Sequence, residues 1–264
     1  MPSFPIFHVD AFTSELFRGN PAAVCVTDRW LEPELMQNIA AENNLSETAF
    51  VMKEGGSYRI CWYAPDAEVA LCGHATLATA FVIHKFFDKD AVKLSFHSKD
   101  YRLSVAILDD QYQLDFPMFR YKERQLGTLP KELQSASVQE CYEGNDTLVL
   151  RLNSRSAVET YEPPLEFIKR NNIFLAITGR TENESYDFVS RFFLPSIGIS
   201  EDPVTGSLHC LLGPIWSDKL DKKVLKAYQA SKRGGEINLQ LAGDRVLLKG
   251  KAILFKTGEI VDIA

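Results

Sequence analysis

The chain has 264 residues, of which 45% are hydrophobic, 24% charged and 11% aromatic, a composition that is typical of a packed globular protein and excludes the disordered, collagen-like and coiled-coil classes. At roughly 100–200 residues per domain, this length predicts two compact domains. The formal net charge of -6 provides no basic field for a phosphate backbone, so we expect no nucleic-acid partner.

The first half of the chain is predicted to contain an amphipathic helix, two strands, an apolar helix and a hairpin, in that order. Pro33 lies near the start of the first helix, where its missing N–H costs no hydrogen bond. The second helix is apolar nearly all round, whereas the runs beside it alternate like half-buried strands. The elements are a helix over 32–44, strands from Glu47 and Tyr58, a helix from Gly73, a strand over 92–96 and a hairpin turning at Asp109-Asp110.

The second half of the chain repeats this order. Pro163 lies near the start of its first helix, and its second helix is again mainly apolar. Equivalent elements lie between 130 residues apart, from Glu32 to Glu162, and 134 residues apart, from Asp109 to Gly243. The elements are a helix over 162–172, strands from Phe174 and Tyr186, a helix from Gly206, a strand over 224–230 and a hairpin turning at Gly243-Asp244.

A repeat at a nearly constant offset predicts two similar domains. Because strands must enclose each apolar helix, we expect an α+β fold in which each domain is a curved sheet or barrel wrapped around a central helix. Residues 117–130 are polar and bracketed by prolines, and we interpret them as a linker. The predicted domains are residues 1–118 and 119–264, with an active site in the cleft between them.

Both central helices begin with glycine followed by a small polar or cationic residue, as Gly73-His74 and Gly206-Ser207. The first N–H groups of a helix lack intrahelical acceptors and the helix dipole is positive there, which favours an anion. The alternative is that the glycines only pack closely and that Ser207 only caps its helix. Two such starts at equivalent positions indicate binding of a small carboxylate.

Ionisable residues near these helix starts are candidates for proton transfer. Glu47 stands among apolar residues at the start of a predicted strand, so it either points to solvent or is buried, where it would suit proton transfer. His74 is either a structural histidine or a catalytic one. Asp202 precedes Pro203, and it either supports the turn before the helix or takes part in the chemistry.

Four ordered strings carry a resemblance to a known family. They are DAFTSELFRGNPAAV (10–24), NLSETAF (44–50), LCGHATLATA (71–80) and EDPVTGSLH (201–209). Together they resemble the PhzF family of phenazine-biosynthesis-type isomerases, which are related to diaminopimelate epimerase. The resemblance extends to RGGE at 233–236 and covers most of the chain. It implies the diaminopimelate epimerase-like fold of two barrel-and-helix domains, in agreement with the repeat.

The resemblance also implies acid/base chemistry without a cofactor. In this family the glutamate that matches Glu47 shuttles the proton, and the residues that match His74 and Asp202 assist and orient. The residues that the resemblance marks as substrate-binding are Gly73, Gly206, Ser207, Ser46 and Asn20.

The related epimerases use one thiol on each side of the α-carbon, whereas this chain supplies only one at a helix start. The repeat offset carries Cys72 onto Thr205, whose hydroxyl cannot replace a thiolate, and Cys210 lies about one turn inside its helix. We therefore expect Cys72 to have little catalytic role, and a two-thiol racemase is disfavoured.

The remaining patterns predict no metal, no cofactor and no membrane anchor. The five cysteines include no CxxC and the five histidines lack i, i+4 spacing, so we expect reduced thiols and no zinc site. The longest apolar runs fall short of the ~20 residues that span a bilayer. The N-terminal residues lack a secretory pattern, which predicts a cytoplasmic location.

The leading hypothesis is an isomerase that moves a proton on a small carboxylate substrate by general acid/base catalysis, with Glu47 as the shuttle. One alternative is an amino-acid epimerase or racemase. The other is a non-catalytic module that binds a small molecule or a protein on the same fold. The family resemblance implies a homodimer, and the identity of the substrate is left open.

Overall fold

The structure is a computed structural model that describes residues 3–181 and 185–261, and the chain divides into two compact units. Unit 1 runs to Asp115 and resumes at Lys249, and unit 2 comprises Phe116–Leu248. The predicted division at residue 118 assigned all residues after it to the second domain. In the structure the last strand, β17 (Ala252–Val261), instead belongs to unit 1, where it pairs antiparallel with β1 (Ser3–Ala11). Unit 1 is therefore closed by strands from both ends of the chain.

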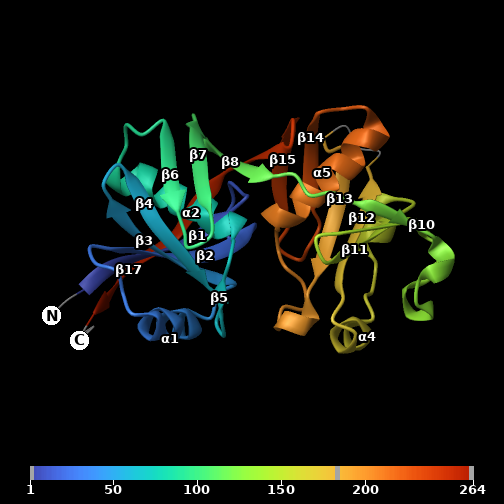
Figure 1. Cartoon of the computed structure of the whole chain (residues 1–264), viewed down its shortest axis with the longest axis horizontal. Coiled ribbons are helices and arrows are strands. Elements are labelled where there is room, and N and C mark those ends of the chain that lie inside the picture. The colour runs from blue at the N-terminus through green and yellow to red at the C-terminus, as the bar shows by residue number, and fades with distance from the viewer. Residues whose placement is uncertain (1–2, 182–184, 262–264) are drawn as a thin grey trace. The chain divides into compact units, whose positions relative to one another are not determined.

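Unit 1 is a curved sheet that holds one helix, α2, against its strands (Figure 1). Along the sheet, β1 pairs antiparallel with β2, β2 parallel with β3, β3 antiparallel with β4, β4 parallel with β6, and β6, β7 and β8 antiparallel in turn. The elements are β2 (Asn20–Thr27), α1 (Pro33–Asn43), β3 (Glu47–Glu54), β4 (Ser57–Tyr63), β5 (Glu68–Val69), α2 (Gly73–Val82), the π-helix η1 (Ile83–Phe87), β6 (Lys93–His97), β7 (Arg102–Leu108) and β8 (Gln111–Pro117).

Unit 2 has a second sheet with its own central helix, α5 (Figure 1). In this sheet β10 pairs antiparallel with β9 and β11, β11 parallel with β12, β12 antiparallel with β13, β13 parallel with β14, and β14 antiparallel with β15. The elements are β9 (Lys122–Arg124), η2 (Leu126–Thr128), η3 (Lys131–Leu133), β10 (Val138–Gly144), β11 (Thr147–Leu152), α3 (Arg155–Glu159), α4 (Leu165–Arg170), β12 (Phe174–Arg180), β13 (Phe188–Phe193), η4 (Pro195–Ile197), α5 (Gly206–Leu220), β14 (Val224–Gln229), β15 (Gly235–Ala242) and β16 (Arg245–Gly250).

The two sheets have the same sequence of antiparallel and parallel pairings, which confirms the predicted repeat. In each unit the parallel pairs are joined by helical crossovers, since parallel strands cannot be joined by a tight hairpin. The central helix is the second crossover in both units. All ten residues of α2 are buried, which confirms that an all-apolar helix is enclosed by the sheet.

Two details differ from the sequence-based expectation. Residues 117–130 are not a bare linker, because they contain β9, which pairs with β10. The helix predicted over 162–172 is limited to Leu165–Arg170, and a short helix, Arg155–Glu159, precedes it. Ser154 caps that unpredicted helix by accepting a hydrogen bond from the N–H of Ala157, a local signal that the repeat comparison did not use.

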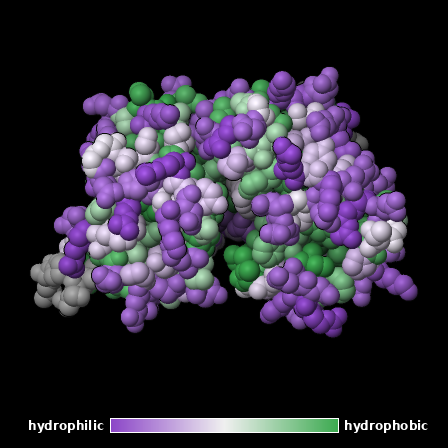
Figure 2. Space-filling view, in the orientation of Figure 1, coloured by the Kyte–Doolittle hydropathy of each residue, from purple (hydrophilic) through white to green (hydrophobic). Residues whose placement is uncertain are grey.

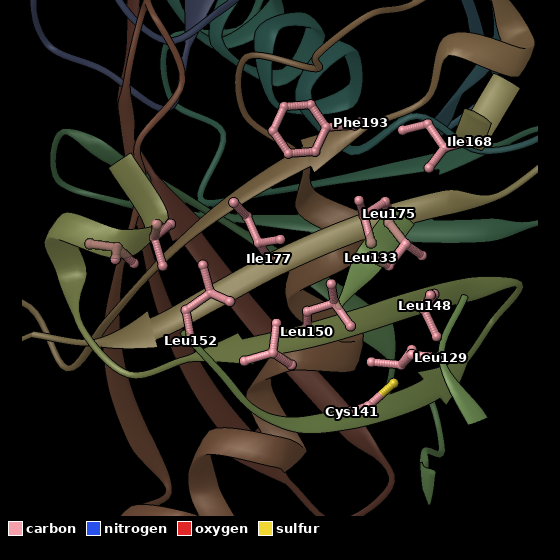
Figure 3. Packing of buried hydrophobic residues seen from close by; sticks show 13 residues of the cluster. Leu129, Leu133, Cys141, Leu148, Leu150, Leu152, Ile168, Leu175, Ile177 and Phe193 are labelled. Carbon is pink, nitrogen blue, oxygen red and sulfur yellow. The ribbon is translucent and has the colours of Figure 1, made fainter. Parts of the chain in front are cut away.

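Each unit also has a hydrophobic cluster on the sheet face that its outer helices cover. In unit 2, Leu150 and Ile177 from neighbouring strands pack with Ile168 of α4 (Figure 3). In unit 1, Phe50 and Met36 belong to the cluster between the sheet and α1. Hydrophilic residues cover most of the face seen in Figure 2. Within the described residues, no helix combines the length and hydropathy needed to cross a membrane.

Candidate active site

Glu47 and His74 meet where strand β3 and helix α2 begin. Glu47 is the first residue of β3, and His74 follows Gly73 in the first turn of α2. Oε2 of Glu47 lies 3.0 Å from Nε2 of His74, and the two side chains are 12% and 6% exposed, respectively. The side chain of Glu47 is therefore turned toward His74 and only slightly exposed, a position in which a carboxylate is suited to proton transfer.

Two further side chains contact the imidazole of His74, and a third bonds to one of them. Nδ2 of Asn20 lies 3.2 Å from Nδ1 of His74, and Sγ of Cys72 lies 3.5 Å from the same atom. The hydroxyl of Ser46 donates a hydrogen bond of 3.2 Å to Oδ1 of Asn20. The parallel register of β2 with β3 places Asn20 on the same sheet face as Glu47. Sheet register and helix start thus bring together residues that are far apart in the sequence.

Burial and neighbouring groups shift the pKa values in this cluster. Burial raises the pKa of the Cys72 thiol, and Glu47 raises it further, so Cys72 is a protonated thiol at neutral pH. Burial lowers the pKa of His74, but the neighbouring carboxylate of Glu47 raises it, and the pKa of His74 lies above its usual value. The cluster therefore favours an imidazolium beside the carboxylate of Glu47.

Two polar atoms of the cluster are buried without a hydrogen bond. Within the described part of the chain, Oε2 of Glu47 and Nε2 of His74 have no aligned hydrogen-bond partner, although they lie 3.0 Å apart. Leaving a buried polar atom unpaired costs about 1–3 kcal/mol. Both atoms are therefore available to a third group, which a bound ligand would supply.

In unit 2, buried side chains hold the turn before α5. The hydroxyl of Thr205, the N-cap residue of α5, donates to Oδ2 of Asp202. Gln229, fully buried at the end of β14, accepts a 2.8 Å hydrogen bond from the N–H of Thr205 and donates one of 2.7 Å to the carbonyl of Asp202. Ser231 donates to the carbonyl of Pro203 at 2.7 Å. Asp202 thus supports this turn, and its part in the chemistry stays a prediction.

The start of α5 presents Gly206 and Ser207. Gly206 is the first helical residue and is buried, whereas Ser207 is partly exposed. No hydrogen bond of the Ser207 hydroxyl occurs among the contacts of the described residues. Because the first N–H groups of a helix lack intrahelical acceptors, this end can receive an anion.

The structure distributes the predicted site residues between the two units. Unit 1 contains Asn20, Ser46, Glu47, Gly73 and His74, and unit 2 contains Asp202, Gly206 and Ser207. Sequence reasoning missed Gln229, because it ends a strand of ordinary alternation and shares no motif with the turn that it holds. The signal that identifies it is a fully buried glutamine whose hydrogen bonds go to residues 202 and 205.

Cys72, His74 and Glu47 also form a group of possible metal ligands. One ligand atom from each side chain lies within 4.8 Å of the others. A thiolate, an imidazole and a carboxylate are ligands that suit Zn²⁺. The thiol of Cys72 must first lose its proton, however, and burial favours the protonated form. The expectation of no metal site rested on spacing along the chain, which does not reveal this cluster.

A family model described as phenazine biosynthesis-like protein matches residues 9–258. A Pseudomonas aeruginosa protein named as an uncharacterized isomerase is 44% identical over 267 residues, which cover 96% of this chain and 97% of that protein. A crystal structure of a phenazine biosynthesis protein of the PhzF family from Enterococcus faecalis is 40% identical, covers 98% of this chain and 100% of its own, and superposes with a TM-score of 0.92.

A more distant similarity concerns the fold alone. The crystal structure of a probable proline racemase from Agrobacterium radiobacter is 8% identical to this chain, covers 98% of it and 93% of its own chain, and has a TM-score of 0.63. The expected racemase- and epimerase-like architecture of two similar units is thereby confirmed.

Proposed function

The chain belongs to the phenazine biosynthesis-like family, and we propose that it is an isomerase that moves a proton between carbons of a small carboxylate without a cofactor. An isomerase-type function is supported by the family and by the relatives that are named isomerases. The observation that carries the finer proposal is the buried, unpaired Oε2 of Glu47 beside Nε2 of His74.

Glu47 acts as the single acid/base group. Its carboxylate removes a proton from a C–H bond next to an unsaturated or carboxyl group, and the C–H electron pair is delocalised into that group. The resulting glutamic acid, whose proton exchanges with solvent, donates a proton to another carbon on the same face. Acid/base catalysis of this kind contributes typically ~10²–10⁴-fold to the rate.

His74 supports this proton transfer from the side of the helix. The imidazole contacts Asn20 and Cys72 through Nδ1, which leaves Nε2 directed toward the carboxylate of Glu47. Because its pKa is raised, the imidazole of His74 keeps a positive charge beside Glu47, whose own charge changes as it takes up and releases the proton. His74 therefore orients the carboxylate of Glu47.

The carboxylate of the substrate binds at the start of α5. Ser207 supplies a hydroxyl donor there, and the first N–H groups of the helix supply further donors. Gln229 and Thr205 hold the turn that leads into this helix. The donors are thus positioned before the ligand arrives, which limits the entropy lost on binding.

One acid/base group distinguishes this proposal from a two-base epimerase. A two-base mechanism needs a second base on the opposite face of the carbon. The repeat aligns Thr205 with Cys72, but the hydroxyl of Thr205 donates to Asp202, and the thiol of Cys72 is protonated at neutral pH. We therefore favour a proton shift over epimerisation.

Deuterium exchange tests the proposal. The protein is incubated in deuterium oxide with vinylacetate and cyclohexadiene carboxylate, which can shift a proton along a carbon–carbon double bond, and with L-proline, which can only epimerise. Deuterium at the carbons of the first two compounds supports the proposal. Exchange in L-proline alone favours an epimerase, and no exchange in any carboxylate favours a binding module.

Cys72→Ser is expected to retain most of the turnover. The buried thiol is protonated at neutral pH because burial raises its pKa, so it does not serve as a base. Steady-state kinetics and ligand titration measure the effect, with Cys141→Ser as a buried control in unit 2. Loss of turnover with intact ligand binding in Cys72→Ser alone would restore a thiol mechanism.

Ser207→Ala is expected to weaken carboxylate binding by roughly ten- to 150-fold, because it removes one charge-assisted hydrogen bond worth about 1.5–3 kcal/mol. The stability of the free protein should not fall, since the Ser207 hydroxyl makes no described hydrogen bond. Calorimetric titration with a carboxylate and thermal unfolding measure both quantities. An unchanged affinity would show that the ligand binds elsewhere.

A further inference from the structure

Unit 1 contains one buried polar atom that the proposed chemistry does not use. Among the described residues, four buried side-chain atoms lack a hydrogen-bond partner: Oε2 of Glu47, Nε1 of Trp62, Nε2 of His74 and Oγ of Ser196. Glu47 and His74 form the proposed acid/base pair. Trp62 is 1% exposed, and its indole N–H has no acceptor among the described residues.

The strand register places Trp62 beside Glu47. Trp62 on β4 lies directly opposite Ala49 on β3. Ala49 and Glu47 are two residues apart on the same strand, so their side chains share one face of the sheet. A residue diagonal to another on neighbouring strands remains within reach of an aromatic side chain. The indole ring therefore lies on the face from which Glu47 meets His74.

The residues next to Trp62 on β4 and β3 also indicate that its side chain faces α2. Cys61 and Phe50 form the next pair in the register, and both belong to the cluster that packs under α1. Because side chains alternate, Trp62 faces the opposite side, toward α2. On its other edge Trp62 pairs with Val69, three residues before Cys72. Along the sheet, Trp62 is thus flanked by strand β3, which begins with Glu47, and by the segment that leads to Cys72.

We propose that the indole N–H of Trp62 donates a hydrogen bond to an oxygen of the bound substrate, which makes Trp62 a substrate-contacting residue. This inference rests on the proposed function. As Glu47 takes the proton, the C–H electron pair moves toward a conjugated carboxyl or carbonyl group, and its oxygen gains negative charge. A donor in a site without water stabilises that charge more strongly than a donor in water.

The proposal narrows the class of substrate. The reacting carbon must be conjugated with a carboxyl or carbonyl group. The oxygen of that group must reach the indole N–H and accept its hydrogen bond. Saturated amines and hydrocarbons do not meet this requirement, whereas unsaturated oxo- and hydroxycarboxylates do.

Trp62→Phe tests the proposal, because phenylalanine keeps an aromatic ring and removes the N–H. Trp216→Phe is the matched control, since the indole of Trp216 is also buried but donates to Oγ1 of Thr178 at 2.9 Å. In the free protein, Trp62→Phe should lower Tm less than Trp216→Phe, because both variants lose the packing of a buried indole but only Trp216→Phe also loses a hydrogen bond. For the carboxylate that the wild type deuterates, Trp62→Phe should lower kcat/KM by about ten- to 150-fold.

Two results would overturn the proposal. One is a fall in Tm for Trp62→Phe that equals the fall for Trp216→Phe, which would mean that the N–H is bonded within the protein. The other is an exchange rate within twofold of the wild type. If Glu47→Gln is inactive while Trp62→Phe is fully active, this inference fails and the proposed function stands.

A binding measurement separates failure of the proposed function from failure of this inference. Benzoate is a ring carboxylate that cannot isomerise, and it is added to protein labelled with ¹⁵N in the tryptophan indoles. A downfield shift of the Trp62 indole proton supports donation to the ligand, even if the wild type exchanges no carboxylate. An indole resonance that stays in place at saturating benzoate overturns it.

Discussion

Glu47→Gln is expected to keep the fold and to lower turnover by at least ~10²-fold. Glutamine has the shape of glutamate, so it preserves the packing at the start of β3, but it can neither accept nor return the substrate proton. The buried oxygen that approaches Nε2 of His74 to 3.0 Å thereby loses its function as a base. Steady-state turnover and deuterium incorporation measure the loss, and thermal unfolding checks the fold.

Glu42→Gln is the control for the change of charge, since Glu42 lies exposed on α1. It should leave turnover and Tm as in the wild type. Near-normal turnover in Glu47→Gln would exclude Glu47 as the proton shuttle. A large loss of ligand affinity in that variant would instead assign Glu47 to substrate binding.

Gly19→Ala is expected to destabilise the protein by about 3 kcal/mol or more. Gly19 has a φ of +64°, and a Cβ atom there would lie 2.1 Å from the carbonyl oxygen of Ala11 and 2.8 Å from Cγ2 of Thr13. Alanine therefore adds a clash with the backbone to an unfavourable left-handed conformation. Because Asn20 follows directly and contacts His74, the folded fraction should also lose turnover.

Gly55→Ala separates the two causes of this destabilisation. Gly55 has a similar φ of +59°, but a Cβ atom there meets nothing within 4 Å. Only the conformational penalty of about 1–2 kcal/mol applies. Urea unfolding of both variants measures the difference. Equal losses of stability would mean that the approach of Ala11 to Gly19 relaxes without cost.

Some of this protein could be predicted from sequence because the signals are local. Proline near the start of the first helix, the glycine that begins each central helix and the alternation of the strands identify elements without knowledge of their partners. The mainly apolar composition of residues 73–82 required enclosure, and all ten residues of α2 are buried. The repeat offset then predicted the second unit from the first.

Other features are decided only by tertiary structure. The last strand, β17, pairs with β1 and not with the unit that precedes it. Its sequence pattern shows which residues alternate, but an alternating pattern does not specify which edge the strand joins. Gln229 likewise holds the turn at Asp202 from a strand 27 residues further along the chain.

The acid/base cluster depends both on local sequence motifs and on tertiary contacts. Sequence by itself determined the motif residues Glu47 and His74, the glycine at each helix start and the absence of a second thiol in the equivalent position. Tertiary structure decided that Glu47 meets His74 and is only slightly exposed, that Asn20 reaches His74, and that Trp62 lies on the same sheet face as Glu47. The physical reason is that periodicity reports how a segment is buried, whereas the register between strands is set by contacts between distant residues.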